Sequence, residues 1–171
     1  VVNMIPNSKL KVERSQMVEQ NLRLHGKVAI VTGAGSCGSG DNVGKSISTL
    51  FAQEGCDVLL VDIDMSRAEK TLFEIQEKGG TASVIEADVT KSTDCAKIVD
   101  EVIKKYGRLD ILVNNVGISL PGTVLDVAED IWDKVLDVNL KSMMLLSKYS
   151  VPKMQNSGGG SIINISSIVA I

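Results

Sequence analysis

Residues 28–44 read VAIVTGAGSCGSGDNVG and give the first indication of a fold. Val28–Thr32 is a short apolar run rich in β-branched residues, which predicts a buried strand. A glycine-rich loop follows, and residues 42–54 then show helical spacing of apolar residues up to a stop at Gly55. A strand, a glycine-rich loop and a helix in this order bring backbone N–H groups and a helix N-terminus together. The segment therefore predicts a site for a phosphate group.

The rest of the chain repeats this alternation of strand and helix. Apolar runs predict strands at residues 58–61, 82–87, 109–113 and 161–165, and amphipathic spacing predicts helices at residues 66–78, 92–106 and 129–148. The strands are apolar at consecutive positions, as in strands buried on both faces of a parallel sheet. We therefore predict an α/β fold with a doubly wound parallel sheet, in a three-layer αβα arrangement of the Rossmann type.

The composition excludes several classes of protein. The 171 residues suit one domain, and 44% hydrophobic residues provide enough apolar material for its core. A net charge of −3 argues against nucleic acid as a partner. No apolar run approaches the ~18 residues of a membrane span, so we expect no membrane partner. Three cysteines without a C-x-x-C pair argue against disulfides and a metal site, and indicate a reducing, cytoplasmic location.

An acid, Asp62, follows the second predicted strand. In a dinucleotide-binding fold, an acid at this position accepts hydrogen bonds from the adenosine ribose hydroxyls and repels a 2′-phosphate. Ile63 and Asp64 follow it, and no lysine or arginine lies beside it or within the loop before Lys45. The sequence therefore favours NAD over NADP, although a helix-capping or solvent-facing acid would look the same.

A different phosphate-binding motif competes for the same segment. Residues 39–46 read SGDNVGKS and nearly match the P-loop pattern G-x-x-x-x-G-K-[ST]. Ser39 stands where the first glycine belongs, and the motif begins several residues after its strand. A nucleoside triphosphatase is therefore the weaker alternative.

The two ends of the chain depart from the alternating pattern. Residues 1–23 are polar without strand or helix periodicity, and we expect a poorly ordered N-terminal extension. Residues 24–171 would then form a single dinucleotide-binding domain. The sequence stops at Ile171, directly after an apolar strand-like run and without a closing helix. We therefore expect a fold that is incomplete at its C-terminus, in the N-terminal part of a longer protein.

Several motifs, in order, resemble the short-chain dehydrogenase/reductase family over most of the chain. They correspond to the family's opening strand and glycine-rich loop, its adenine-contacting pair, its N-N-A-G motif, its helical asparagine and the end of the strand that carries the catalytic serine. The matching stretches are LHGKVAIVTG at residues 24–33, DV at 88–89, NNVG at 114–117, the asparagine of DVN at 137–139 and INISS at 163–167.

The resemblance implies hydride transfer between NAD and a small-molecule alcohol or carbonyl substrate, in a protein that forms a homo-oligomer when full length. Ser167 would hydrogen-bond the substrate oxygen where charge develops, and Asn139 would hold a water that connects the catalytic lysine to solvent. The residues expected to contact the cofactor are Gly33, Gly35, Val43, Gly44, Asp62, Ile63, Asp88, Val89, Asn115 and Gly117.

The glycine-rich loop departs from the family pattern. It carries extra residues within the range 37–41, so that Asn42 takes the place of the middle glycine if Gly44 is the last one. Asparagine tolerates a positive φ better than most residues do, and we expect the turn to survive for that reason.

The second departure concerns the acid–base pair. The family's Tyr-x-x-x-Lys would follow Ser167 at a position past Ile171. Tyr149 and Lys153 have the right spacing, but they precede the last strand and Pro152 is expected to end their helix, so we interpret the match as coincidence. We therefore expect these 171 residues to be inactive alone, with an uncovered sheet edge at the last strand. A non-catalytic dinucleotide-binding or interaction protein is the second hypothesis.

Overall fold

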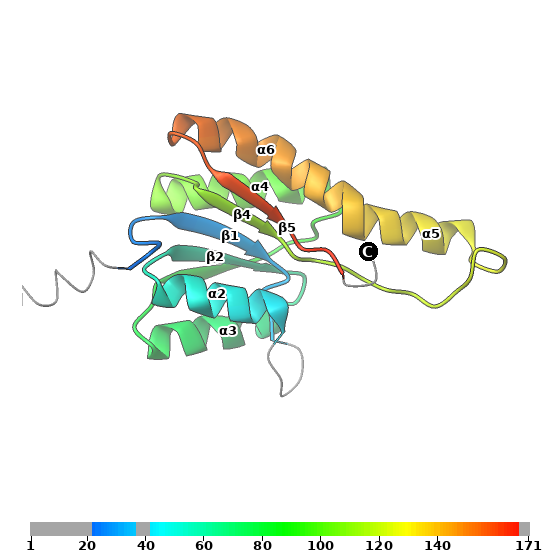
Figure 1. Ribbon diagram of the computed structural model, residues 1–171, viewed down its shortest axis with the longest axis horizontal. Helices are drawn as coiled ribbons and strands as arrows, with labels where there is room; N and C mark the ends of the chain where they lie inside the picture. Colours follow the sequence, from blue (N-terminus) through cyan, green and yellow to red (C-terminus); the bar gives the residue numbers. More distant parts are fainter. Residues whose placement is uncertain (1–21, 37–41, 168–171) are drawn as a thin grey trace, which may run out of the picture.

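Five parallel strands form the centre of the molecule (Figure 1). The computed structural model describes residues 22–36 and 42–167; the expectations for residues 1–21, 37–41 and 168–171 lie outside the described part. The strands are β1 (Val28–Thr32), β2 (Asp57–Asp62), β3 (Ala82–Glu86), β4 (Ile111–Asn114) and β5 (Ser161–Asn164). Their order is β3-β2-β1-β4-β5, and all neighbouring pairs are parallel. The predicted doubly wound sheet is confirmed, because the chain builds outward from β1 in both directions.

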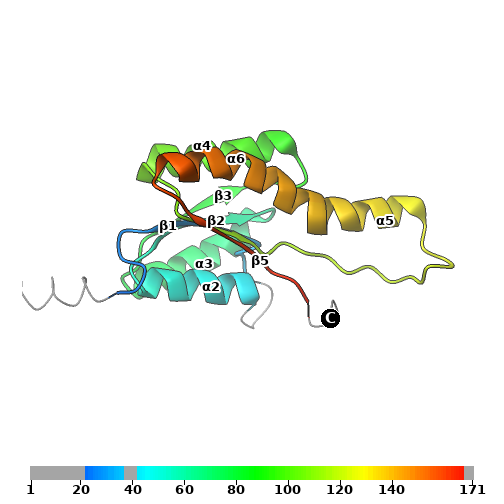
Figure 2. The same ribbon diagram turned by 45° about the horizontal axis from the view of Figure 1, so that its top comes forward.

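Helices cover both faces of this sheet (Figures 1 and 2). Figure 2 shows α2 (Val43–Gln53) and α3 (Met65–Glu77) on one face, with α4 (Ser92–Tyr106) and α6 (Ser142–Asn156) on the other. Helix α5 (Glu129–Leu136) continues through a π-helical turn, η1 (Asp137–Lys141), into α6, and it extends beyond the sheet. The three-layer αβα arrangement is therefore confirmed.

Strand β1 is buried on both faces, as its uninterrupted apolar sequence predicted. Val28 and Ile30 pack in the core on the side of α4 and α6, whereas Ala29 and Val31 pack in the core on the side of α2 and α3. Successive side chains of a strand point to opposite faces, so a strand between two helical layers buries apolar side chains on both of its faces.

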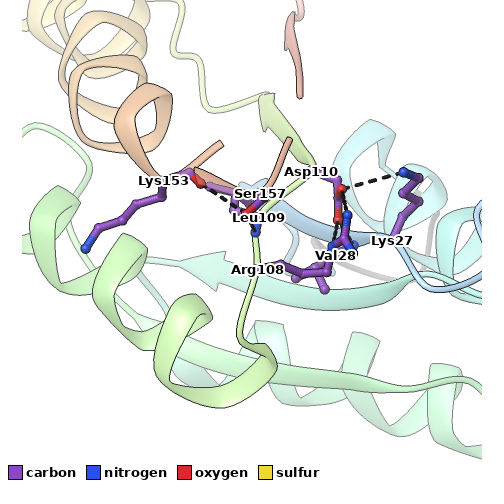
Figure 3. Close-up of polar contacts among 7 residues, drawn as sticks. All are labelled: Lys27, Val28, Arg108, Leu109, Asp110, Lys153 and Ser157. Atoms are coloured by element: carbon purple, nitrogen blue, oxygen red, sulfur yellow. Dashed lines mark hydrogen bonds and ion pairs between the residues drawn. The ribbon is translucent and has the colours of Figure 1, made fainter. Parts of the chain in front are cut away.

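The long helix does not end at residue 148, where the sequence predicted. Helix α6 continues through Pro152, which was expected to end it. Tertiary contacts hold the last turns in place. Met154 is buried in the core, and the Leu109 N–H donates a hydrogen bond to Ser157 Oγ at 3.2 Å (Figure 3). Packing at this site therefore outweighs the helix-breaking tendency of proline.

Strand β5 lies at an edge of the described sheet. Three of its four residues are exposed, and Ile163 is 41% exposed. Among the described residues, β5 therefore pairs with β4 alone.

Two features are missing from residues 22–36 and 42–167. No helix in these ranges combines the length and apolar character needed to cross a membrane, and no group of three or more His, Cys, Asp or Glu side chains is placed to hold a metal ion. Cys56 and Cys95 are free and buried, and burial raises the pKa of these thiols to about 12 and about 11. Both therefore behave as small core residues.

A buried carboxylate, Asp110, joins the amino-terminal ends of the neighbouring strands β1 and β4 (Figure 3). Its Oδ2 accepts the Val28 N–H at 3.0 Å. Arg108 donates to both carboxylate oxygens, at 2.6 and 2.8 Å, and the Lys27 Nζ lies 3.6 Å from Oδ1. Asp110 therefore connects β1 to the start of β4 through one charged group.

These contacts control the charge of Asp110. Burial alone would raise the pKa of this carboxyl, because burial disfavours the charged form. The hydrogen bonds from Arg108 and the Val28 N–H, with the charges of Arg108 and Lys27, outweigh burial and hold the pKa below its ordinary value. Such a carboxyl contributes its full stabilisation when the pH is above the pKa that it has in the unfolded chain. The contribution is lost as the pH falls through the lower pKa of the folded state.

The variant Asp110→Asn is expected to destabilise the fold by about 1–3 kcal/mol at neutral pH, because the Arg108 guanidinium loses its partner and the Val28 N–H its charged acceptor. The difference from wild type should shrink as the pH falls below about 4, the ordinary pKa of a carboxyl, and should be lost once the pH passes the lowered folded-state pKa of Asp110. Urea unfolding followed by circular dichroism at both pH values measures the effect. Asp100→Asn, at a 73% exposed side chain, is the matched control and should stay within about 0.5 kcal/mol of wild type. A loss that does not change with pH would contradict this account.

Candidate functional site

A cavity of about 520 Å³ lies at the carboxyl-terminal edge of the sheet. At this edge β1 lies between β2 and β4, where the order of strand connection reverses and where α/β proteins bind ligands. The ten residues predicted to contact a cofactor all line this cavity, which we call the first cavity; they are Gly33, Gly35, Val43, Gly44, Asp62, Ile63, Asp88, Val89, Asn115 and Gly117. The fold thus brings together residues from five separate segments of the sequence.

Other residues of the first cavity were not selected from the sequence. Lys134 and Val138 line it from the helical segment of α5 and η1, and Thr90 and Ile118 line it from the segments after β3 and β4. Lys134 and Val138 are four residues apart and therefore share one face of the helix. That spacing was visible in the sequence, but no motif indicated that this face meets the cavity.

Thr32 and Asn115 join the carboxyl-terminal ends of β1 and β4. The Asn115 N–H donates to Thr32 Oγ1 at 3.0 Å, and Thr32 Oγ1 donates to the Val113 carbonyl at 3.2 Å. The Asn115 side-chain amide donates to the carbonyls of Thr32 and Gly33, at 3.0 and 3.2 Å. The Asn115 amide nitrogen is therefore engaged in holding the start of the glycine-rich loop.

Two glycines allow α2 to begin close to the end of β1. A Cβ at residue 44 would overlap the Gly33 carbonyl and lie 2.6 Å from Asn115 Nδ2, so only Gly44 fits in this place. Gly33 has a φ of +61°, in the left-handed region that favours glycine. The N-terminus of α2 is consequently held against the end of β1.

Asp62, at the end of β2, is oriented by two backbone groups. The Gly35 N–H donates to Oδ2 at 2.8 Å, and the Asp64 N–H donates to Oδ1 at 3.1 Å. A Cβ at residue 35 would lie 2.6 Å from both Asp62 Oδ2 and Arg67 Cβ, so the close approach of the loop requires Gly35. The carboxylate is therefore held in one orientation on the wall of the first cavity.

Arg67 is a basic residue close to this acid that sequence order did not reveal. It lies in the first turn of α3, and its carbonyl accepts the Ser36 N–H at 3.1 Å. Its Nε lies 3.1 Å from Asp64 Oδ2. No lysine or arginine lies next to Asp62 in the sequence, as expected. In the structure, however, the turn into α3 places Arg67 beside the glycine-rich loop.

The backbone conformation of Asn42 differs from the positive φ that the sequence suggested. Its φ of −112° and ψ of 167° are extended values, and no described residue other than glycine has a positive φ. Asn42 is the N-cap of α2, with Oδ1 accepting the Lys45 N–H at 2.8 Å. The expected positive φ is wrong because N-cap residues take extended backbone angles.

Asp88 holds the segment after β3. Its Oδ1 accepts hydrogen bonds from Thr90 Oγ1 and the Thr90 N–H, at 2.7 and 3.0 Å, and Lys91 Nζ lies 3.3 Å from Oδ2. The hydrogen bonds from Thr90, aided by Lys91, lower the pKa of Asp88 in spite of partial burial. The carboxylate therefore fixes this segment, and the adjacent Val89 is buried.

A second cavity, of about 670 Å³, shares residues Asn115–Ile118 with the first. Asn139 and Ser167, the two predicted catalytic residues, both line it. Asn139 lies in η1, where its Oδ1 accepts the Ile118 N–H at 2.8 Å and its Nδ2 donates to the Ile118 carbonyl at 2.9 Å. Single π-helical turns inside helices frequently occur at functional sites.

Tyr149 and Lys153 lie away from Ser167. The Tyr149 Oη is 2.7 Å from Ser92 Oγ on α4, and the Lys153 Nζ is 3.4 Å from Asp100 Oδ1. Neither residue lines the second cavity. Their Tyr-x-x-x-Lys spacing is therefore coincidental with respect to the serine.

The P-loop alternative depends on Lys45. Its Nζ lies 2.6 Å from Glu74 Oε1 on α3, and Lys45 does not line the first cavity. A P-loop lysine must reach the phosphates. The observed ion pair gives the triphosphatase alternative no support.

Comparison with known proteins identifies relatives. A family model described as short chain dehydrogenase matches residues 27–171. An uncharacterized oxidoreductase of Thermotoga maritima is 41% identical over 146 residues, which make up 85% of this chain and 55% of that protein. A 3-oxoacyl-[acyl-carrier-protein] reductase, FabG, of the same organism is 37% identical over 150 residues, or 88% of this chain and 59% of that protein.

A solved structure shares the same architecture. It is a 7 alpha-hydroxysteroid dehydrogenase complexed with NADH and 7-oxo glycochenodeoxycholic acid, 37% identical, with a TM-score of 0.81 over 88% of this chain and 56% of that chain. The chain thus spans about half the length of the relatives it matches, 55% and 59% of the two Thermotoga proteins. The match to the family model includes every residue that lines the two cavities, and the chain therefore belongs to the short-chain dehydrogenase family of oxidoreductases.

Proposed function

We propose that this chain provides the cofactor-binding part of an NAD-dependent oxidoreductase, which transfers a hydride between the nicotinamide and a small alcohol or carbonyl substrate. The observation that carries the proposal is the Asp62 carboxylate, which stands on the wall of the first cavity with each oxygen oriented by a backbone N–H. The related hydroxysteroid dehydrogenase was solved with NADH, which supports a dinucleotide as the ligand of this cavity.

Local charge favours NAD over NADP. Each oxygen of Asp62 accepts one N–H and retains a further lone pair, which suits the ribose hydroxyls as donors. A 2′-phosphate would meet the negative charge of the same carboxylate. Arg67 lies close by, but its guanidinium is paired with Asp64.

The other residues of the first cavity that the sequence predicted are assigned to the other parts of the dinucleotide. Val43 and Gly44 lie in the first turn of α2, where helix N–H groups carry partial positive charge and suit a diphosphate. Gly33 and Gly35 allow the close approach of the loop backbone. We assign Ile63, Asp88 and Val89 to the adenosine part and Asn115 and Gly117 to the nicotinamide part.

Ser167 and Asn139 are assigned to the chemistry in the second cavity. When bound, a nicotinamide cofactor would supply or accept the hydride. The Ser167 hydroxyl would donate a hydrogen bond to the substrate oxygen as charge develops there. The side chain of Asn139 is engaged by Ile118, so a relay water would be held at the Asn139 backbone in the π-helical turn.

The proposal extends to the domain organisation, cellular location and self-association of the full-length protein. We propose that residues 24–171 form one dinucleotide-binding domain preceded by an extension at residues 1–23. The free thiols of Cys56 and Cys95 support a cytoplasmic location. Exposed apolar side chains on the α5–η1 segment, Trp132 at 56% and Leu140 at 63%, support self-association of the full-length protein.

The variant Asp62→Asn tests the cofactor assignment. We expect NADH to bind about 10–100-fold more weakly, since a hydrogen bond to a charged group contributes about 1.5–3 kcal/mol, while NADPH binding weakens less. Nucleotide fluorescence measures both affinities. Asp57→Asn, at the opposite end of β2, is the matched control and should leave both affinities unchanged. Tighter binding of NADPH than of NADH by the wild type would contradict the proposal.

A second candidate, dinucleotide binding without turnover, is favoured for these 171 residues by the positions of the tyrosines. The sequence contains two tyrosines, and each hydroxyl lies 2.7 Å from a serine of another element: Tyr106 from Ser83 and Tyr149 from Ser92. Neither tyrosine lines the cavity that contains Ser167. These residues therefore provide no tyrosine as the proton donor for a substrate there.

The 171-residue chain is accordingly expected to bind NADH and to show no reduction of aldehydes or ketones above an enzyme-free blank. Loss of NADH absorbance at steady state measures turnover, with the FabG relative of Thermotoga maritima as the positive control for the assay. Turnover clearly above the blank would show that these residues contain a complete acid–base system.

A further inference from the structure

Asn42 takes part in three hydrogen bonds beside the glycine-rich loop. Its Oδ1 accepts the Lys45 N–H at 2.8 Å, and its backbone carbonyl accepts the Ser46 N–H at 2.9 Å, which starts α2. Its side-chain nitrogen, Nδ2, donates to the carbonyl of Gly35 on the other side of the loop. One side chain therefore ties the beginning of the loop to the beginning of the helix.

This tie is part of a longer chain of hydrogen bonds. The Gly35 N–H donates to Asp62 Oδ2 at 2.8 Å, and the Gly35 carbonyl accepts from Asn42. The acid assigned to the ribose is thus linked through Gly35 and Asn42 to the helix N-terminus assigned to the diphosphate. These hydrogen bonds link the two binding groups, in addition to the close fit of Gly44 against Gly33.

The Asn42 side-chain amide has a second N–H group, and the residue lines the first cavity. A side-chain amide carries two N–H groups, and the Gly35 carbonyl uses one of them. Asn42 lines the first cavity next to Val43 and Gly44, whose N–H groups have no acceptor within the described residues. A glycine, which the family pattern has at this position, would supply neither the tie nor the donor.

We propose that the Asn42 side-chain amide donates a hydrogen bond to the diphosphate of the bound dinucleotide, while it fixes the distance between the ribose acid and the N-terminus of α2. The inference rests on the proposed function, because it takes the first cavity to be the dinucleotide site. It makes Asn42 a binding residue particular to this chain's glycine-rich loop.

Two variants and three ligands test the inference on the 171-residue chain. Asn42→Asp keeps the cap acceptor for Lys45 but replaces the amide donor with a negative charge. Asn42→Gly removes the donor without adding charge. We expect both variants to bind ADP and NADH at least about tenfold more weakly, with the larger loss for Asn42→Asp, because a hydrogen bond to a phosphate involves a charged acceptor. Adenosine lacks phosphates, and its affinity should change by less than about twofold on the same scale.

Asn156→Asp, at an exposed residue near the end of α6, is the matched control for adding one negative charge and should bind all three ligands as the wild type does. Competition with NADH fluorescence, at a temperature where every variant is folded, gives the affinities. Unchanged ADP and NADH affinities in Asn42→Gly would overturn the inference. A parallel loss for adenosine, ADP and NADH would also overturn it, because the amide would then only shape the loop. If the wild type bound none of the three ligands, the proposed function would itself be contradicted.

Discussion

The amide of Asn115 joins the ends of β1 and β4, and the geometry of the first cavity depends on this joint. Its nitrogen donates to the carbonyls of both Thr32 and Gly33, while Thr32 Oγ1 accepts the Asn115 N–H. These bonds hold Gly33 at its left-handed φ, which directs the chain out of β1 and into the loop. Gly44 then fits against Gly33, so the N-terminus of α2 lies beside the switch point of the sheet. The first-turn N–H groups of α2 are thereby presented to the cavity.

Different chemistry joins β1 and β4 at the amino-terminal and carboxyl-terminal ends of the strands. At the amino-terminal edge, the charged Asp110 joins β1 and β4 through Arg108, Lys27 and the Val28 N–H. At the carboxyl-terminal edge, neutral amides and hydroxyls make the equivalent connection. The Asp62 carboxylate lies on the cavity wall, outside this neutral connection. The connection between β1 and β4 therefore places no carboxylate beside the partly positive N-terminus of α2. The charged group at the amino-terminal ends of the strands therefore contributes to stability, and the carboxyl-terminal ends are available for ligand binding.

Much of the fold and of the first cavity could be predicted from the sequence, because both follow from local patterns. Strands buried on both faces carry consecutive apolar or β-branched residues, so Val28–Thr32 could be predicted with the bounds that the structure shows. Parallel strands place their carboxyl ends at one edge, so Asp62, Asp88 and Asn115 could be expected to meet there although they lie far apart in the sequence.

The errors have a common origin in tertiary contacts. Pro152 stays within α6 because the buried Met154 holds the next turn. Arg67 comes close to Asp62 because α3 turns back along the loop, which sequence distance does not show. Asn42 was expected to replace a glycine by tolerating a positive φ, whereas it replaces the glycine by capping a helix and bonding across the loop. Each case depends on a contact in the folded chain that the periodicity of strands and helices does not show.

The most direct test of this account is a titration of the ¹⁵N-labelled chain with NADH, followed by amide proton–nitrogen correlation spectra. The largest changes are expected at Gly35, Val43 and Gly44, which line the first cavity. The amides of Gly79 and Gly107, in the turns that precede β3 and β4 at the opposite edge, should not move. Changes centred on those turns, with Gly35 and Gly44 unaffected at saturation, would contradict the assignment of the dinucleotide to this cavity.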